Sequence, residues 1–178
     1  MDVMTFISYS SADEPVARQI SELLKKNGIT TWFAPDDVKK TPSGNYALEI
    51  PKAIECCNLL LVCVSRDSLA SSDVAKEVSL ARGARKRIIP VVITQDTKDA
   101  ILDAAKCVAS PWALYELSNN NLWGPYSELV ELAADFLEYC RNWQDGLQSP
   151  VRPLPPKPSD AEPDFWPDDP DFPPPPAV

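Results

Sequence analysis

Two apolar runs in the middle of the chain, LLLVCVS at 59–65 and RIIPVVIT at 87–94, constrain the fold more than any other feature. Neither run alternates between apolar and polar residues, so each is predicted to be a strand that is buried on both faces. Strands of this kind belong to parallel sheets, because the crossover between two parallel strands places helices over the sheet. Two further strands are predicted at 3–10 and 29–34.

Segments with helical periodicity separate the predicted strands. Apolar residues recur three and four positions apart over 13–28, 46–57, 71–81 and 125–143, which predicts helices there. A weaker strand is predicted at 112–118. The alternation of strands and helices predicts an α/β fold with a central parallel sheet of about five strands and helices on both faces.

Two stretches of the sequence show no periodicity. Residues 35–45 contain two prolines and a glycine, and are predicted to be a long loop. Composition changes near Pro150 to a proline-rich, acidic sequence that cannot build a core. The chain is therefore divided into a folded domain at 1–148 and a tail at 149–178. The tail is either a solubilising extension or a segment that lies across a domain surface through its aromatic residues, chiefly Trp166.

Composition excludes several classes of function. The chain has no histidine, which removes Ser-His-Asp and Cys-His catalysis and most zinc sites. Its five cysteines lack metal-ligand spacing, so they are interpreted as reduced thiols of a cytoplasmic protein with no bound metal. A net charge of −9 without a long basic stripe argues against nucleic acid, and no apolar run is long enough to span a membrane. The one basic cluster ends a predicted helix, where cations complement the dipole: Arg82, Arg85, Lys86 and Arg87.

Glu77 is out of place in the helix predicted at 71–81. At about 100° per residue it falls about 60° from Val74, on the edge of the apolar face. A carboxylate at such an edge is costly unless it has a partner or a task. Two interpretations remain open, an ion pair with Arg82 or Arg85 and a functional role.

Polar residues follow the first strand, at the edge of a parallel sheet where ligands bind. The sequence YSS at 9–11 has no glycines, so it matches neither the dinucleotide-binding fingerprint nor the phosphate-binding loop. Ser10 or Ser11 either caps the following helix or binds a ligand through its hydroxyl group.

Four segments in order resemble the Toll/interleukin-1 receptor (TIR) domain family: FISYSSAD at 6–13, WFAPDDVKKTPSGNY at 32–46, LLLVCVSRDSLASSDVAKEV at 59–78 and IIPVVI at 88–93. The resemblance covers about residues 1–140 and implies a flavodoxin-like fold. Some members of this family only associate with one another. Others cleave NAD⁺ between nicotinamide and ribose.

The form of these segments is similar to bacterial, NAD-consuming members of the antiviral-defence, Thoeris-like kind. The resemblance implies that Glu77 is the catalytic glutamate of an NAD⁺ nucleosidase. NAD⁺ is then the substrate, and no permanently bound cofactor is expected. It implies that the product is ADP-ribose, a cyclic isomer or a conjugate, which a separate effector protein senses. Other TIR subunits are expected as partners in a homo-oligomer. The alternative is a non-enzymatic TIR–TIR interaction module.

A set of residues around Glu77 is predicted to bind NAD⁺. NAD-consuming members often carry an aromatic residue four positions before the glutamate, where this chain has Asp73. Trp32 or Tyr46 is therefore expected to supply the stacking surface, although Trp32 and Phe33 also suit the core. The complete set lies near the ends of strands and the turns that follow them: Ser8, Tyr9, Ser10, Ser11, Trp32, Phe33, Asp36, Asn45, Tyr46 and Asp73.

Overall fold

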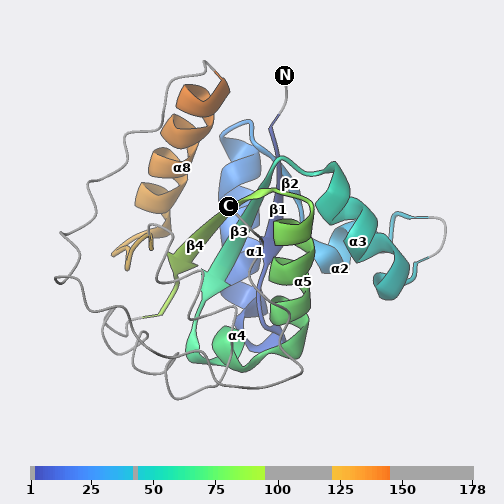
Figure 1. Ribbon diagram of the computed structural model, residues 1–178. Helices are drawn as coiled ribbons and strands as arrows, with labels where there is room; N and C mark the ends of the chain where they lie inside the picture. Colours follow the sequence, from blue (N-terminus) through green and yellow to red (C-terminus); the bar gives the residue numbers. More distant parts are fainter. Residues whose placement is uncertain (1–2, 42–43, 95–121, 145–178) are drawn as a thin grey trace, which may run out of the picture.

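A computed structural model describes residues 3–41, 44–94 and 122–144 of the chain (Figure 1). The predicted strand at 112–118 and the tail at 149–178 lie outside these residues. The boundary predicted at 148 also lies outside them, so the division into domain and tail stays a prediction.

The described residues form one parallel sheet of four strands, in the order β2-β1-β3-β4. The strands are β1 Met4–Ser8, β2 Thr30–Trp32, β3 Leu59–Val64 and β4 Arg87–Val92. This order is that of a flavodoxin-like α/β fold and confirms the predicted fold class. The described residues contain four of the about five predicted strands. The segment expected to form the fifth lies outside them, so that strand stays a prediction.

Two layers of helices enclose the sheet (Figure 1). Helices α1 Glu14–Lys26 and α8 Leu129–Gln144 pack on one face. Helices α3 Tyr46–Cys56 and α5 Ser72–Gly83 pack on the other. Three short helical segments complete the described fold: η1 Ser11–Asp13, α2 Ala34–Val38 and α4 Arg66–Ala70.

The side chains of β3 divide the core into two halves. All six residues of this strand are buried. Leu60, Val62 and Val64 face α3 and α5, whereas Leu59, Leu61 and Cys63 face α1 and α8. Side chains alternate between the faces of a strand, so an unbroken apolar run can supply both layers at once.

The segment after β2 is not the continuous loop that was predicted, because it begins with α2. The backbone N–H of Phe33 donates to Asp37 Oδ2 at 2.7 Å, and the N–H of Asp37 donates to the Phe33 carbonyl at 3.0 Å. Pro35 suits the first turn of a helix, where its missing N–H is not needed. Val38 is the last residue of the helix, and it is buried in the core with 1% of its surface exposed. A helix of five residues is too short for its periodicity to be seen in the sequence.

We expect Leu61→Ala to lower the free energy of unfolding by about 2–5 kcal/mol, because it leaves a cavity in the central strand. Leu61 is fully buried, whereas Leu80 on α5 is 42% exposed. The matched control, Leu80→Ala, should cost less than about 1 kcal/mol. Urea unfolding at equilibrium measures both, and equal losses for the two variants would contradict this account of the core.

Candidate functional site

The carboxyl ends of β1 and β3 form a topological switch point. β2 lies on one side of β1, whereas β3 and β4 lie on the other, so the connections after β1 and β3 leave the sheet in opposite directions. In open α/β sheets, ligands bind in the crevice outside such a point. The segments that follow these strands, 9–13 and 65–71, are therefore the first place to look for a site.

Glu77 reaches this edge from α5. Ser8 is the last residue of β1 and is fully buried, and its Oγ donates a hydrogen bond to Glu77 Oε2 at 2.6 Å. Ser8 shares a face of the strand with Phe6, which packs in the half of the core that α5 covers. Ser71 caps α5 by accepting from the backbone N–H of Val74 at 3.3 Å. Val74, Val78 and Ala81 are buried, and this packing sets the rotation of the helix that directs Glu77 toward β1.

Burial raises the pKa of Glu77 from 4.5 to about 7. The hydrogen bond from Ser8 opposes this shift, because it favours the charged carboxylate, and the charge of Asp73 adds to the shift. No cation is among the causes of the shift. Of the two interpretations that the sequence left open, the ion pair with Arg82 or Arg85 therefore finds no support there. Near neutral pH the half-buried carboxyl group is poised between its two protonation states.

Asp13 joins the ends of β1 and β3. Its Oδ2 accepts from Ser10 Oγ at 2.9 Å and from Ser65 Oγ at 2.6 Å. Ser65 Oγ also accepts from the backbone N–H of Ser68 at 3.0 Å, so one hydroxyl group caps α4 and bonds to Asp13. The sequence analysis missed Asp13 and Ser65. The one available signal was a serine directly after a buried strand, which suits a helix cap.

Tyr9 lies on the other side of the same edge. Its ring stacks on Phe33 with centroids 5.0 Å apart, and the Arg18 guanidinium lies 4.8 Å from the centre of the Phe33 ring. Burial raises the pKa of Tyr9, and the charges of Glu14 and Glu77 raise it further. The Tyr9 hydroxyl group therefore lies close enough to Glu77 to be affected by its charge, so both side chains belong to this edge.

Trp32 and Phe33 point to opposite faces of the sheet, and both are buried. The Trp32 ring stacks on Phe6 with centroids 4.8 Å apart, in the half of the core under α3 and α5. Phe33 packs in the other half, against Tyr9. Each ring already has an aromatic partner in the protein.

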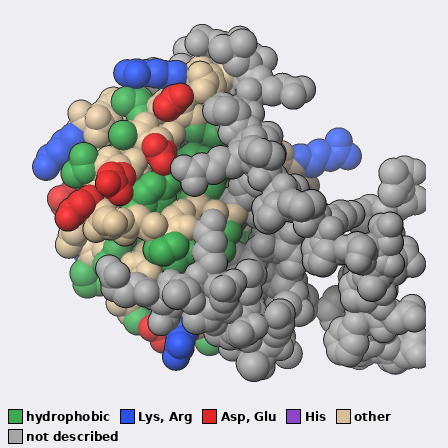
Figure 2. Space-filling model, turned by 90° about the vertical axis from the view of Figure 1, so that its left-hand side faces the viewer, with side chains coloured by type: hydrophobic (Ala, Val, Ile, Leu, Met, Phe, Trp, Pro, Cys, Tyr) green, Lys and Arg blue, Asp and Glu red, His purple; other side chains and the backbone are tan. Residues whose placement is uncertain are grey.

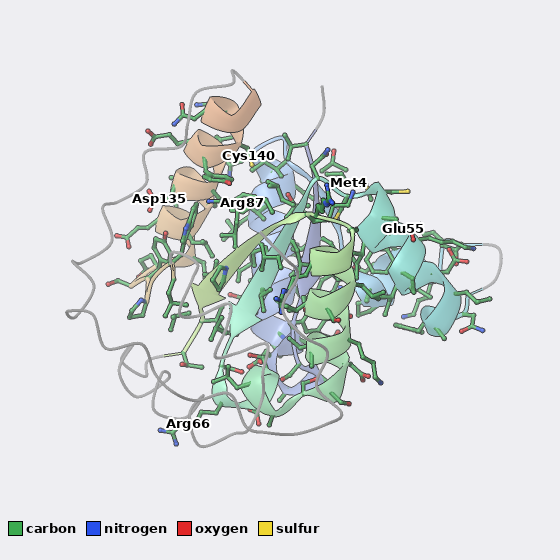
Figure 3. All side chains as sticks on the ribbon, in the orientation of Figure 1. Met4, Glu55, Arg66, Arg87, Asp135 and Cys140 are labelled. Atoms are coloured by element: carbon green, nitrogen blue, oxygen red, sulfur yellow. The ribbon has the colours of Figure 1, made fainter. Side chains whose placement is uncertain are left out.

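The remaining predicted residues surround this edge at the surface. Asp36 Oδ2 accepts from Arg18 Nη1 at 2.8 Å, and Asn45 caps α3 by accepting from the N–H of Ala47 at 3.0 Å. Tyr46, in the first turn of α3, is 46% exposed. Asp73 is exposed in the first turn of α5 and pairs with Lys76 at 3.1 Å. Ser11 is exposed at the start of η1. The labelled Arg66, at the start of α4, marks this end of the molecule in Figure 3.

The fold and the strand-end site define a flavodoxin-like α/β protein with a carboxylate at its switch point. Residues 5–119, more than half of the chain, match the family described as TIR domain. The chain therefore belongs to the TIR domain family.

One solved structure that is similar to this chain is described as "Structure of the activated Roq1 resistosome directly recognizing the pathogen effector XopQ (TIR domains)". It is 15% identical, with a TM-score of 0.57, and the match covers 77% of this chain and 98% of that chain. At this identity the likeness concerns the fold. Comparison with curated proteins found no significant match. Among the helices of the described residues, none is both long and apolar enough to cross a membrane.

We expect Glu77→Gln to stabilise the fold at high pH and to change it little at low pH. Because the pKa of Glu77 is higher in the folded protein, its contribution to stability is complete below pH 4.5 and is lost as the pH rises through about 7. The shift corresponds to about 3 kcal/mol at most. Glutamine keeps an acceptor for Ser8 without the charge.

Urea unfolding at about pH 5 and about pH 8.5 measures this difference. The matched control is Glu22→Gln, on the exposed side of α1, for which we expect no gain at the higher pH. If Glu77→Gln changes the free energy of unfolding by the same amount at both pH values, the carboxyl group is not desolvated in the folded protein.

Proposed function

We propose that this protein cleaves NAD⁺ between nicotinamide and ribose, with Glu77 as the catalytic carboxylate. The single observation that carries the proposal is the position of Glu77, half-buried and bonded to Ser8 at the carboxyl end of β1. Membership of the TIR domain family supports the proposal, because the NAD-consuming members carry their glutamate in the segment that LLLVCVSRDSLASSDVAKEV resembles.

The chemistry suits one carboxylate in a chain without histidine. Nicotinamide leaves a cationic pyridinium as a neutral molecule, so its departure needs no proton. Positive charge then develops on the ribose as an oxocarbenium ion, which a fixed carboxylate stabilises. Partial burial strengthens this interaction, because water does not screen it.

The raised pKa of Glu77 fits a group that acts when its substrate arrives. Bringing the positively charged nicotinamide ring close to the carboxyl group favours the ionised form and lowers the pKa again. Ser8 holds one carboxylate oxygen at 2.6 Å. The other oxygen of the carboxylate is then available to the ribose.

Tyr46 is the better candidate for the aromatic residue that Asp73 does not provide. Trp32 is 8% exposed and stacks on Phe6, whereas Tyr46 is 46% exposed at the start of α3. The Tyr46 side chain also contributes to the raised pKa of Tyr9, which indicates that it reaches the same edge as Glu77. We therefore assign the stacking role to Tyr46. The proposed polar contacts to NAD⁺ come from the turns at this edge: Ser8, Tyr9, Ser10, Ser11, Asp36 and Asn45.

The wider biological setting is also part of this proposal. The product is ADP-ribose, a cyclic isomer or a conjugate, and it acts as a nucleotide signal in bacterial antiviral defence. A separate effector protein senses it in the cytoplasm. Other copies of the chain complete the active assembly, since the edge around Glu77 alone provides little contact for a large dinucleotide.

A second candidate function is a non-enzymatic TIR–TIR interaction module. It is favoured by apolar side chains that lie exposed in the first turn of α3, next to the segment after β2. Tyr46 is 46% exposed and Leu48 is 53% exposed. Such a module would lose its function on Leu48→Asp and keep it on Glu77→Gln.

We expect Glu77→Gln to lower nicotinamide release from NAD⁺ by about 100-fold or more, because the variant removes the charge that stabilises the transition state. Liquid chromatography of the reaction mixture measures free nicotinamide. The matched control Glu22→Gln should release nicotinamide at the rate of the unaltered protein. Equal release by the two variants, or none by the unaltered protein at any concentration, would contradict the proposed activity and favour the interaction module.

We expect kcat/KM for NAD⁺ to rise with pH through about 7, because the reaction needs the ionised form of Glu77. Removing the hydrogen bond in Ser8→Ala raises the pKa of Glu77 further, so the midpoint of the profile should move to higher pH. The matched control is Ser79→Ala, which changes an exposed serine two residues beyond Glu77 and should leave the midpoint in place. If Ser8→Ala lowers kcat/KM at every pH without moving the midpoint, the hydrogen bond from Ser8 does not control the pKa of the group that titrates.

A further inference from the structure

The amino edge of the sheet, opposite the candidate site, is where the main helices end. Each crossover helix runs antiparallel to the strands, so α1, α3 and α5 finish at this edge, and α8 finishes there as well (Figure 1). In Figure 3 the labels Met4, Glu55, Arg87 and Cys140 lie toward this end, whereas Arg66 lies at the other end.

This edge is strongly basic, although the chain as a whole carries a net charge of −9. The segments that form it are 25–30, 54–58, 82–87 and 141–144. Within these described segments Glu55 is the single carboxylate. The same segments contain seven cations, which we call the basic edge: Lys25, Lys26, Arg82, Arg85, Lys86, Arg87 and Arg141.

Helix dipoles account for part of this charge only. The end of a helix carries about −0.5 of an elementary charge, so four helix ends attract about two cations. With Glu55 included, these two sources offset about three of the seven positive charges, so the named segments keep a net charge of about +4. The outer face of α8 differs from its end, because Glu131, Asp135 and Glu138 are exposed on it. On the side of the molecule that Figure 2 shows, acidic side chains lie close together and basic ones lie at the margin.

The fold holds the centre of the basic edge in place. Arg85 has a positive φ of 54°, which turns the chain after α5. The Lys86 backbone N–H donates to the Ala81 carbonyl at 2.8 Å, and Lys86 Nζ donates to the Glu55 carbonyl at 2.6 Å. Arg87 lies against the Tyr139 hydroxyl group and lowers its pKa against the effect of burial. Lys86 and Arg87 are therefore held in place at the centre of the basic edge.

The chain itself supplies an acidic segment beyond the end of α8. Helix α8 ends at Gln144 beside Arg141. The residues after it, 145–178, include seven carboxylates and two cations. Six of the carboxylates fall within 160–171, which has no cation and contains Phe165 and Trp166.

The spacer between Gln144 and Asp160 is long enough for this segment to fold back. Fifteen residues separate the two, and they span about 20 Å as a flexible chain or about 45 Å when extended. A sheet of four strands is about 15 Å wide. A tether of this length gives an effective concentration on the order of millimolar, so weak contacts suffice. Guanidinium groups pair with carboxylates and stack on aromatic rings, and 160–171 offers both.

We propose that residues 160–171 bind the basic edge of their own chain, with carboxylates on its arginines and Trp166 stacked on a guanidinium group. Bound in this way, the segment neutralises the edge and competes with any other polyanion for it. The proposal does not depend on the activity of Glu77, which lies at the opposite edge of the sheet.

The test uses the full chain, labelled with ¹³C and ¹⁵N, and carbon-detected NMR, because prolines have no N–H. We expect the resonances of 160–171 at about 0.05 M NaCl to differ from those of a synthetic 150–178 peptide, and to move to the peptide's values at about 1 M NaCl. Arg82→Glu with Arg85→Glu should release the segment at low salt. The matched control, Lys39→Glu with Lys40→Glu, makes the same charge change next to α2 and should not.

A second pair, Asp168→Asn with Asp169→Asn, changes only the tail and should also release it, so the test holds even if the arginine variant unfolds. Two results would overturn the proposal. One is that the resonances of 160–171 in the unaltered chain already coincide with those of the peptide at low salt. The other is that neither pair of variants moves them. The proposal also fails if unlabelled unaltered protein restores the bound resonances of the labelled arginine variant, because the tail would then bind a neighbouring copy. A free tail together with duplex-DNA binding that the arginine variant loses would assign the edge to nucleic acid instead.

Discussion

Burial of β3 on both faces is the constraint on which the rest of the structure depends. Its six residues supply apolar side chains to two separate halves of the core, and neither half can be left open to water. Helices must therefore cover both faces, and the connections after β1 and β3 must leave in opposite directions. The switch point at the carboxyl ends of these strands follows from that requirement. Ser8 and Glu77 meet there because one ends β1 and the other lies on a helix that covers the same face.

A polar network holds the two central strands at this point. Asp13 accepts from Ser10 after β1 and from Ser65 after β3, and Ser65 also caps α4. Ser10 and Ser65 are both buried, so losing the carboxylate would leave two buried O–H donors without this acceptor. α5 begins directly after α4, so the geometry of Glu77 relative to Ser8 depends on contacts that lie outside the site itself.

Sequence patterns located the features that depend on local spacing. The apolar run of β3 and the position of Glu77 at the edge of an apolar face both follow from patterns within about ten residues. The features that were missed depend on contacts between distant residues. Ser65 and Asp13 are 52 positions apart, and no pattern in either segment indicates the other. Helix α2 was missed because it is five residues long, and Arg18 on another helix holds its Asp36. The sequence did not decide whether Trp32 and Phe33 belong to the core or to the site. Consecutive aromatic residues at the end of a strand can both be buried, one in each half of the core, and both are.

The basic edge also gives the described part of the molecule an electrical axis. Cations gather where the strands begin, whereas many carboxylates, including Asp13, Asp36 and Glu77, lie where the strands end. The strand direction is therefore the direction of a permanent dipole moment. Two copies that lie side by side in the same orientation place like charges next to each other, whereas copies stacked head to tail place opposite charges in contact. Head-to-tail contacts use two different surfaces of each copy, so they do not close into a pair and can be repeated along a line. Copies that lie side by side in opposite orientations also place opposite charges in contact, and they close into a symmetric pair. The polarity of a single domain thus disfavours parallel side-by-side contacts, and screening by salt or by an acidic segment weakens this effect.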